Sequence, residues 1–168
     1  MTTKDNLVLN EKQVRQKISR IAYEIYENNY KEKKLVIAGI TETGFNLAKL
    51  LIRGLKKISP FELQLVRIEI DKDDPAQGDV DLDCDLKTLK KTVIILVDDV
   101  LSTGRTFMHS MKPFLEIEVK KIETAVLVNR SHKSFPISAD YKGYELSTTL
   151  NDHIEVKLEK DNFAVYLY

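Results

Sequence analysis

The stretch Val93–Thr106, VIILVDDVLSTGRT, decides the fold of this sequence. It opens with five apolar residues in a row, a pattern typical of a strand that is buried on both faces of a parallel sheet. Asp98 and Asp99 follow, and then a turn containing a glycine leads into a helix predicted from about Arg105 to Leu115. In open α/β sheets, ligands bind beyond the carboxyl ends of such strands. The stretch therefore predicts both a parallel sheet and the edge at which its ligand lies.

The remaining sequence predicts an α/β domain with a mostly parallel central sheet flanked by helices. Helical spacing of apolar residues predicts helices over residues 11–29 and 45–58. Continuous or alternating apolar runs predict strands at 35–40, 61–70, 122–128, 153–158 and 163–167, while 41–44 is predicted as a turn and 71–92 as a long loop. Strands that alternate with helices favour this class. Because no linker divides the chain, we expect residues 1–168 to form a single domain.

Composition narrows the function classes. The 26 basic residues are balanced by 26 acidic ones, so the net charge gives no positive argument for a nucleic-acid-binding surface. No apolar run is long enough for a signal peptide or a membrane helix. Cys84 is the single cysteine, which excludes an intrachain disulfide. We therefore expect a cytoplasmic protein that does not bind membranes.

Asp98 and Asp99 require a compensating partner. Two adjacent carboxylates at a strand end are costly unless a cation or hydroxyl donors accompany them, and vicinal ribose hydroxyls or Mg²⁺ would serve. About four residues after the acid pair, the turn Ser102–Thr106 offers backbone N–H groups and hydroxyls that can bind a phosphate. The spacing suits one sugar phosphate. The alternative is a plain strand-to-helix turn with solvated aspartates, and response-regulator receivers also carry acids at strand ends; a P-loop is excluded because no GK[ST] ending follows.

The motif resembles the signature of the type I phosphoribosyltransferases, which use phosphoribosyl pyrophosphate (PRPP). That signature is an apolar strand, two acids and then x-x-x-[ST]-G-x-[ST]. The segments GITETGFNLAK (39–49), RIEIDKDD (67–74) and TAVLVNRSHKSFPISADYKGYELSTT (124–149) are similar to the PyrR-like branch, which combines uracil phosphoribosyltransferase activity with RNA-binding control of pyrimidine operons. The resemblance extends over about residues 17–167.

The resemblance implies a role for each of these segments. Asp98 and Asp99 would bind the ribose hydroxyls, with the cofactor Mg²⁺ nearby, held directly or through water. A lid would lie at about 71–92 and hood elements at about 130–150. The residues that the resemblance assigns are Ser102, Thr103, Gly104, Arg105 and Thr106 for the 5′-phosphate; Thr41, Glu42, Thr43 and Gly44 for pyrophosphate; Lys72, Asp73 and Asp74 as lid candidates for catalysis; and Arg130 and His132 for the base. No general base is assigned. The implied partners are PRPP and a nucleobase or nucleotide, and a homodimer is expected.

Three departures from the family pattern bear on whether the chain catalyses the reaction, only binds the substrate, or also binds RNA. The pyrophosphate turn usually reads K-T-R-G, whereas here Thr41–Gly44 reads TETG and has lost its cation. The lid begins DKDD in place of Y-R-D-D, and lysine keeps the charge of arginine but not its bidentate fork. In the first helix, T-R-x-x-H becomes SRIAY, and Ser138, Tyr144 and Leu150 stand at usually basic hood positions, which disfavours RNA binding.

The leading hypothesis is a Mg²⁺-dependent phosphoribosyltransferase, with uracil as the best candidate base, giving UMP and pyrophosphate. The alternative is a PyrR-like regulatory protein that binds PRPP or a nucleotide with weak turnover, with or without RNA-binding attenuator activity. Asp79–Asp83 also imitates a calcium loop, but Cys84 and Lys90 stand where such a loop needs glycine and glutamate.

Overall fold

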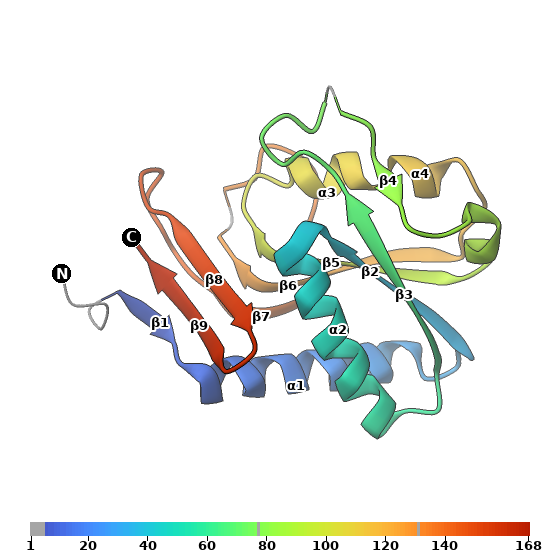
Figure 1. Cartoon of the computed structure of the whole chain (residues 1–168), viewed down its shortest axis with the longest axis horizontal. Coiled ribbons are helices and arrows are strands. Elements are labelled where there is room, and N and C mark those ends of the chain that lie inside the picture. Colours follow the sequence, from blue (N-terminus) through green and yellow to red (C-terminus); the bar gives the residue numbers. More distant parts are fainter. Residues whose placement is uncertain (1–5, 77, 131) are drawn as a thin grey trace.

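The computed structural model describes residues 6–76, 78–130 and 132–168 and is built around a six-stranded sheet (Figure 1). The strand order is β4-β3-β2-β5-β6-β7, and only β3 and β4 pair antiparallel. The strands are β2 (Lys34–Ile40), β3 (Glu62–Glu69), β4 (Asp81–Leu82), β5 (Val93–Leu101), β6 (Lys121–Asn129) and β7 (Tyr141–Glu145). The predicted mostly parallel sheet is confirmed, with β5 between β2 and β6.

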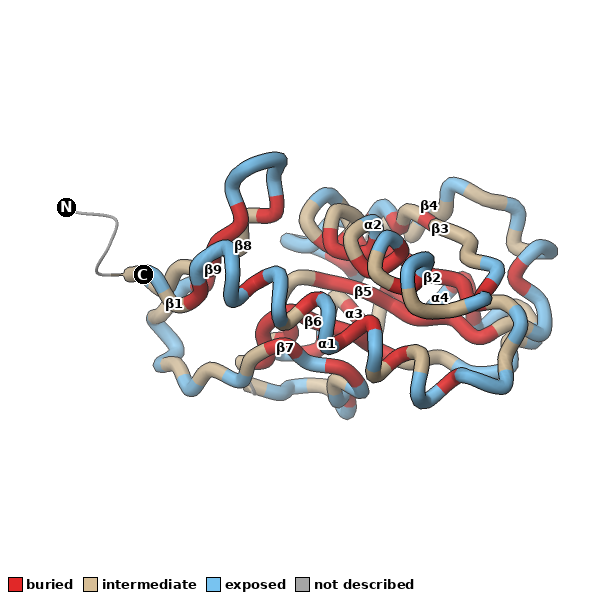
Figure 2. Tube along the Cα trace, turned by 90° about the horizontal axis from the view of Figure 1, so that it is seen from below, coloured by how far each residue is buried: buried red, intermediate tan, exposed pale blue. Residues whose placement is uncertain are grey.

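Helices cover both faces of this sheet. Helices α1 (Glu11–Asn29) and α2 (Thr41–Ile58) pack on one face, and the short α3 (Arg105–Ser110) and α4 (Lys112–Leu115) pack on the other (Figure 1). Successive residues of β5 point to opposite faces: Ile95 and Val97 join the core beneath α1 and α2, while Ile94 and Leu96 join the core beneath α3 and α4. Figure 2 shows the resulting band of buried chain through the central strands. This burial on both faces explains the continuous apolar run of β5.

A second, antiparallel sheet lies beside the first. Its order is β1-β9-β8, formed by β1 (Leu7–Leu9), β9 (Asn162–Leu167) and β8 (Ile154–Glu159). Its buried side chains, among them Leu158, Phe163 and Val165, belong to the same core as α1 and α2. Across the described ranges, no helix combines the length and the apolar character needed to cross a membrane.

Several predicted boundaries were wrong. Thr41–Gly44 is the first turn of α2 rather than a separate turn. The predicted loop 71–92 contains β4 and a 3₁₀ helix, η1 (Leu86–Leu89). The predicted helix 105–115 is two helices, because Pro113 has no N–H to continue the hydrogen-bond ladder of α3. The segment 141–145, which was expected among the hood elements, forms the edge strand β7 of the main sheet.

Candidate active site

Asp98 and Asp99 lie at the carboxyl edge of the main sheet. The pairing of β5 with β2 ends at Val97, but its pairing with β6 continues to Leu101, so both acids lie beyond the last residue pair between β5 and β2. Asp98 is buried, with 2% of its surface exposed, whereas Asp99 is only partly buried. Oδ1 of Asp98 accepts the N–H of Asp99 at 2.9 Å, and Oδ1 of Asp99 accepts the N–H of Val100 at 2.8 Å. These backbone bonds fix both carboxylates.

The first turn of α2 packs directly against Asp98. A methyl group on Gly44 would lie 2.8 Å from the carbonyl oxygen of Val97 and 3.1 Å from Cα of Asp98. Only glycine allows this approach. Thr41, the first residue of α2, has a φ of 51°, a left-handed conformation that is an outlier for a β-branched residue. Such strain concentrates at functional sites, and here it coincides with the segment predicted to bind pyrophosphate.

The turn Ser102–Thr106 is held by the segment that follows β6. The carbonyl oxygen of Thr103 accepts the N–H groups of Ser134 at 2.9 Å and Phe135 at 3.1 Å. Gly104 has a φ of 87°, in the region that favours glycine, and a methyl group there would lie 3.2 Å from Cβ of Ile137. The predicted phosphate turn is therefore sandwiched between the sheet edge and the segment 134–137. Arg105 and Thr103 are exposed at its surface.

Lys72 reaches from the predicted lid to both acids. Its Nζ lies 2.8 Å from Oδ1 of Asp98 and 3.6 Å from Oδ1 of Asp99. Burial alone would lower the pKa of Lys72, but attraction to the two carboxylates, Asp98 first, outweighs burial and raises it. The pKa of Asp98 is raised well above its ordinary value by burial and then by the charge of Asp99, with Lys72 acting in the opposite direction. Asp73 and Asp74, by contrast, are exposed in the predicted lid segment.

The acid pair also suits Mg²⁺. This ion usually takes one or two carboxylates from a protein and completes its octahedral shell with water and substrate phosphates. Asp98 and Asp99 supply that pair, and the ammonium of Lys72 shows that the site attracts a cation. Among the described residues, no three His, Cys, Asp or Glu side chains gather as a larger metal site.

Comparisons with known proteins agree with this geometry. The family model for the phosphoribosyl transferase domain matches residues 6–161. The chain belongs to the phosphoribosyltransferase family. The "Bifunctional protein PyrR" of Fusobacterium nucleatum is 35% identical, covering 95% of this chain and 94% of that protein, and the protein of the same name from Bacillus subtilis is 32% identical, covering 95% and 96%.

Solved structures of other phosphoribosyltransferases share the fold. A hypoxanthine-guanine phosphoribosyltransferase from Bacillus anthracis matches with a TM-score of 0.74 at 18% identity, covering 97% of this chain and 98% of that one. The hypoxanthine phosphoribosyltransferase of Trypanosoma cruzi matches with a TM-score of 0.77 at 16% identity, covering 96% and 95%. The predicted fold class and family are thus confirmed.

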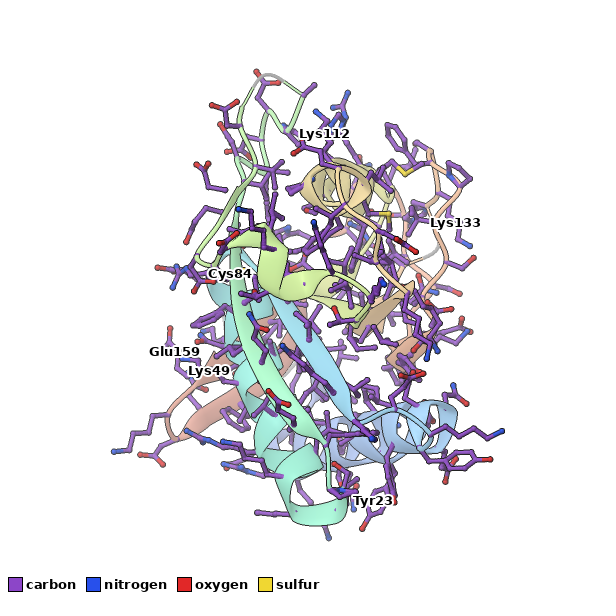
Figure 3. The ribbon with its side chains drawn as sticks, turned by 90° about the vertical axis from the view of Figure 1, so that its right-hand side faces the viewer. Tyr23, Lys49, Cys84, Lys112, Lys133 and Glu159 are labelled. Atoms are coloured by element: carbon purple, nitrogen blue, oxygen red, sulfur yellow. The ribbon has the colours of Figure 1, made fainter. Side chains whose placement is uncertain are left out.

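The side chains of the predicted base-binding residues contact the loop after β7. The guanidinium of this phosphoribosyltransferase's Arg130 donates to Oγ1 of Thr148 at 3.0 Å and to the carbonyl oxygens of Thr149 and Asp152 at 3.1 and 2.9 Å. Nε2 of His132 lies 2.9 Å from the same Thr148 hydroxyl. Lys133, labelled in Figure 3, donates instead to Oγ of Ser138 at 3.1 Å. Arg130 and His132 therefore meet at Thr148 and anchor the loop over residues 148–152.

Asn129 is a candidate residue of the site that the sequence did not lead us to predict. It is the last residue of β6, pairs with Leu101 of β5, and is 6% exposed. Its Nδ2 lies 3.4 Å from Oε1 of Glu145 on β7. A polar residue that ends the apolar run TAVLVN at the same sheet edge as the acid pair was the available signal.

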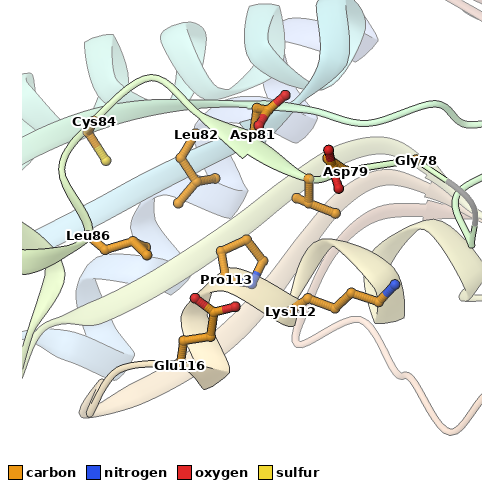
Figure 4. Close-up of a pocket in the computed structure, with 10 residues that line it drawn as sticks. Gly78, Asp79, Asp81, Leu82, Cys84, Leu86, Lys112, Pro113 and Glu116 are labelled. Atoms are coloured by element: carbon orange, nitrogen blue, oxygen red, sulfur yellow. The ribbon is translucent and has the colours of Figure 1, made fainter.

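A cavity of about 450 Å³ lies apart from these residues, between the β4 segment and α4 (Figure 4). Leu82, Leu86 and Pro113 form apolar parts of its wall, and Cys84 also lines it. Burial, and then the neighbouring charge of Asp83, raise the pKa of the Cys84 thiol. A raised pKa disfavours the reactive thiolate. None of the residues predicted to bind PRPP lines the cavity.

Proposed function

We propose that the protein binds PRPP with Mg²⁺ and transfers its ribose 5-phosphate to a nucleobase, with uracil as the best candidate, releasing pyrophosphate. One observation carries the proposal: three segments predicted to bind three parts of PRPP converge at one sheet edge. The acid pair of β5 contacts the first turn of α2 through Gly44, and the turn Ser102–Thr106 follows on the same strand.

Each segment then has a task. Asp98 and Asp99 accept hydrogen bonds from the ribose hydroxyls and so orient the sugar, since ionised carboxylates are strong acceptors. The turn Ser102–Thr106 holds the 5′-phosphate with backbone N–H groups and hydroxyls, and Thr41–Gly44 faces the pyrophosphate. Mg²⁺, when bound, supplies positive charge to the leaving pyrophosphate.

The reaction itself demands mainly positioning. The bond between ribose C1 and the pyrophosphate oxygen breaks, a bond from C1 to a nitrogen of the base forms, and the proton of that nitrogen passes to water. Holding the two reactants in line supplies a large part of such a rate enhancement, and no general base is assigned. Asn129 lies at the same sheet edge, where its amide Nδ2 donates to Glu145 at 3.4 Å and so ties the ends of β6 and β7 together.

A second function is favoured by a specific observation. The turn that faces pyrophosphate carries Glu42 where the family pattern carries no acid, and the cation nearest to the acid pair, Lys72, is already bound to it. A chain that binds PRPP or a nucleotide but releases pyrophosphate slowly would act as a PyrR-like regulator. Replacing Thr43 with arginine should then raise turnover, and salt-dependent binding to a pyrimidine-operon leader RNA would add the attenuator activity.

The test of the proposed function is pyrophosphate release from PRPP with Mg²⁺ and each common base. Asp98→Asn and Asp99→Asn should each lower the rate by about ten- to a hundredfold, since a charge-assisted hydrogen bond contributes roughly 1.5–3 kcal/mol. Asp81→Asn, an exposed aspartate of β4, is the matched control and should leave the rate unchanged. Absence of product with every base, together with absence of PRPP binding, would remove both functions. PRPP binding without product supports the regulator.

A further inference from the structure

Lys72 places a cation of the protein itself on the acid pair. Its Nζ lies within hydrogen-bond distance of Asp98, at 2.8 Å, and within ion-pair distance of Asp99, at 3.6 Å. Its side chain remains 36% exposed, whereas the side chain of Asp98 is 3% exposed. The lysine therefore covers the acids from the solvent side, the direction from which a ligand must arrive.

The contact occupies acceptor capacity that a ligand needs. A carboxylate oxygen offers about two lone-pair positions, and Oδ1 of Asp98 already accepts the N–H of Asp99 and the ammonium of Lys72. A ribose hydroxyl that donates to this oxygen must displace the lysine. A divalent cation beside the pair must also displace it, because like charges at this distance repel.

Displacement of Lys72 also removes the contact that holds its segment against the acid pair. The Asp71 carboxylate accepts the N–H groups of Asp73 at 2.9 Å and Asp74 at 3.3 Å, so residues 71–74 form one tied turn. This turn begins two residues after the end of β3 and forms the start of the predicted lid. When the ammonium of Lys72 leaves the acids, either the turn 71–74 moves with it or the side chain alone changes its conformation. In both cases residues 71–74 lose their contact with the acid pair.

We propose that Lys72 is a latch, which closes the acid pair while the site is free of ligand and releases the lid segment 71–76 when Mg²⁺ and the ribose phosphate take its place. The latch rests on the proposed function, because it regulates access to the same site. It couples occupancy of the acid pair to the position of the lid through a single ion pair.

The first experiment measures binding of Mn²⁺ alone, by the loss of the free-ion signal in electron paramagnetic resonance. Lys72→Met keeps the length of the side chain and removes its charge, so Mn²⁺ should bind about tenfold more tightly than to the wild-type protein, a coupling of ordinary size for competing ligands. Lys72→Arg keeps the charge and should stay near wild type. Lys87→Met, an exposed lysine of η1, is the matched control and should also stay near wild type. Equal, weaker or undetectable Mn²⁺ binding by Lys72→Met would overturn the latch.

A second measurement follows the lid by hydrogen–deuterium exchange over residues 71–76. Exchange should be faster in Lys72→Met than in the wild-type and Lys87→Met proteins, because the ion pair between Lys72 and the acids is lost. Unchanged exchange in Lys72→Met would contradict the release of the lid.

Ribose 5-phosphate binding, measured by calorimetry on the same variants, separates the latch from the function. Tighter Mn²⁺ binding by Lys72→Met with no ribose 5-phosphate binding by any variant supports the latch and removes the proposed function. Ribose 5-phosphate binding with unchanged Mn²⁺ affinity removes the latch and leaves the function standing.

Discussion

The approach of α2 to the acid pair makes Gly44→Ala the most informative substitution in this chain. The new methyl group would meet three atoms of β5: the carbonyl oxygen of Val97 at 2.8 Å, Oδ1 of Asp98 at 3.0 Å and Cα of Asp98 at 3.1 Å. Two of these three are backbone atoms in the centre of the sheet, which cannot turn aside as the end of a side chain can. Either the first turn of α2 or the acid pair must therefore shift.

Gly54→Ala in the same helix is the matched control. There the methyl group would meet only Cβ of Ala22 on α1, at 3.2 Å, a contact that a few tenths of an ångström of helix movement relieves. Both substitutions gain helix propensity, worth at most about 1 kcal/mol. Only Gly44→Ala adds overpacking against rigid backbone, which typically costs about 1–3 kcal/mol. The difference between the two variants isolates the contact with β5.

We expect Gly54→Ala to unfold at or slightly above the wild-type temperature, and Gly44→Ala to be less stable than Gly54→Ala by about 1–3 kcal/mol. For a chain of this size that difference corresponds to roughly 2–12 °C in Tm. Thermal and urea unfolding measure it, and a thermal shift with ribose 5-phosphate reads the site. That shift should persist in Gly54→Ala and shrink in Gly44→Ala. Equal stability and equal ligand shifts in the two variants would refute the inferred contact.

Three further predictions follow from local strain and charge. Asp98→Asn should stabilise the protein at pH 7. Because the pKa of Asp98 is raised, the native state binds the proton of this carboxyl more tightly than the unfolded chain does, and the free energy of unfolding falls as pH rises from 3.8 towards the native pKa. Urea unfolding at several pH values should show that this fall is lost in the variant. Thr41→Gly should raise the free energy of unfolding by about 1 kcal/mol, because glycine adopts a φ of 51° without strain, and an unchanged urea midpoint would argue against strain at this residue. Cys84 should react with iodoacetamide more slowly than glutathione at pH 7.5 and accelerate as pH rises, since burial and Asp83 raise its pKa; fast labelling of folded protein would contradict this.

The sequence predicted best the elements whose patterns arise from burial alone. Strand β5 and helix α1 are examples: β5 is apolar throughout because both its faces are covered, and α1 carries Val14, Ile18, Ile21 and Ile25 on one buried face, as its spacing predicts. The acid pair was found for the same reason, because charged residues at the end of such a strand stand out against it.

The elements that were missed depend on contacts between distant segments. Strand β7, with the sequence YKGYE, has no clear apolar pattern and forms because β6 offers it a parallel edge, where Gly143 lies too close to the carbonyl oxygen of Leu127 for any side chain. Thr41–Gly44 has the composition of a turn, yet it becomes helical where it packs against Val97 and Asp98. Neither contact is visible in local spacing.

The pairing of Lys72 with the acids belongs to the same class. Lys72 lies 26 positions before Asp98 in the sequence, and its own segment DKDD offers the lysine three nearer aspartates. Burial decides between them. An ion pair at an exposed surface contributes little, whereas Asp98 is almost fully buried and its charge is costly without a partner. The lysine is therefore expected to prefer the buried acid to its exposed neighbours.

The fold does not determine which base this phosphoribosyltransferase would use. Hypoxanthine phosphoribosyltransferases share the fold at 16–18% identity, while the proteins named PyrR share 30–35% of the sequence, and a common fold supports different substrates. The acid pair lies on β5 and the turn Ser102–Thr106 joins β5 to α3, and both would bind only the ribose phosphate, which these reactions have in common. On the proposed function, discrimination between bases would then come from the loop over residues 148–152 that Arg130 anchors. Arg130→Met, which removes the guanidinium bonds to Thr148, Thr149 and Asp152, should accordingly change the order of preference among bases in the pyrophosphate-release assay and leave ribose 5-phosphate binding nearly unchanged. A loss of ribose 5-phosphate binding equal to the loss of activity would show instead that Arg130 supports the sheet edge as a whole.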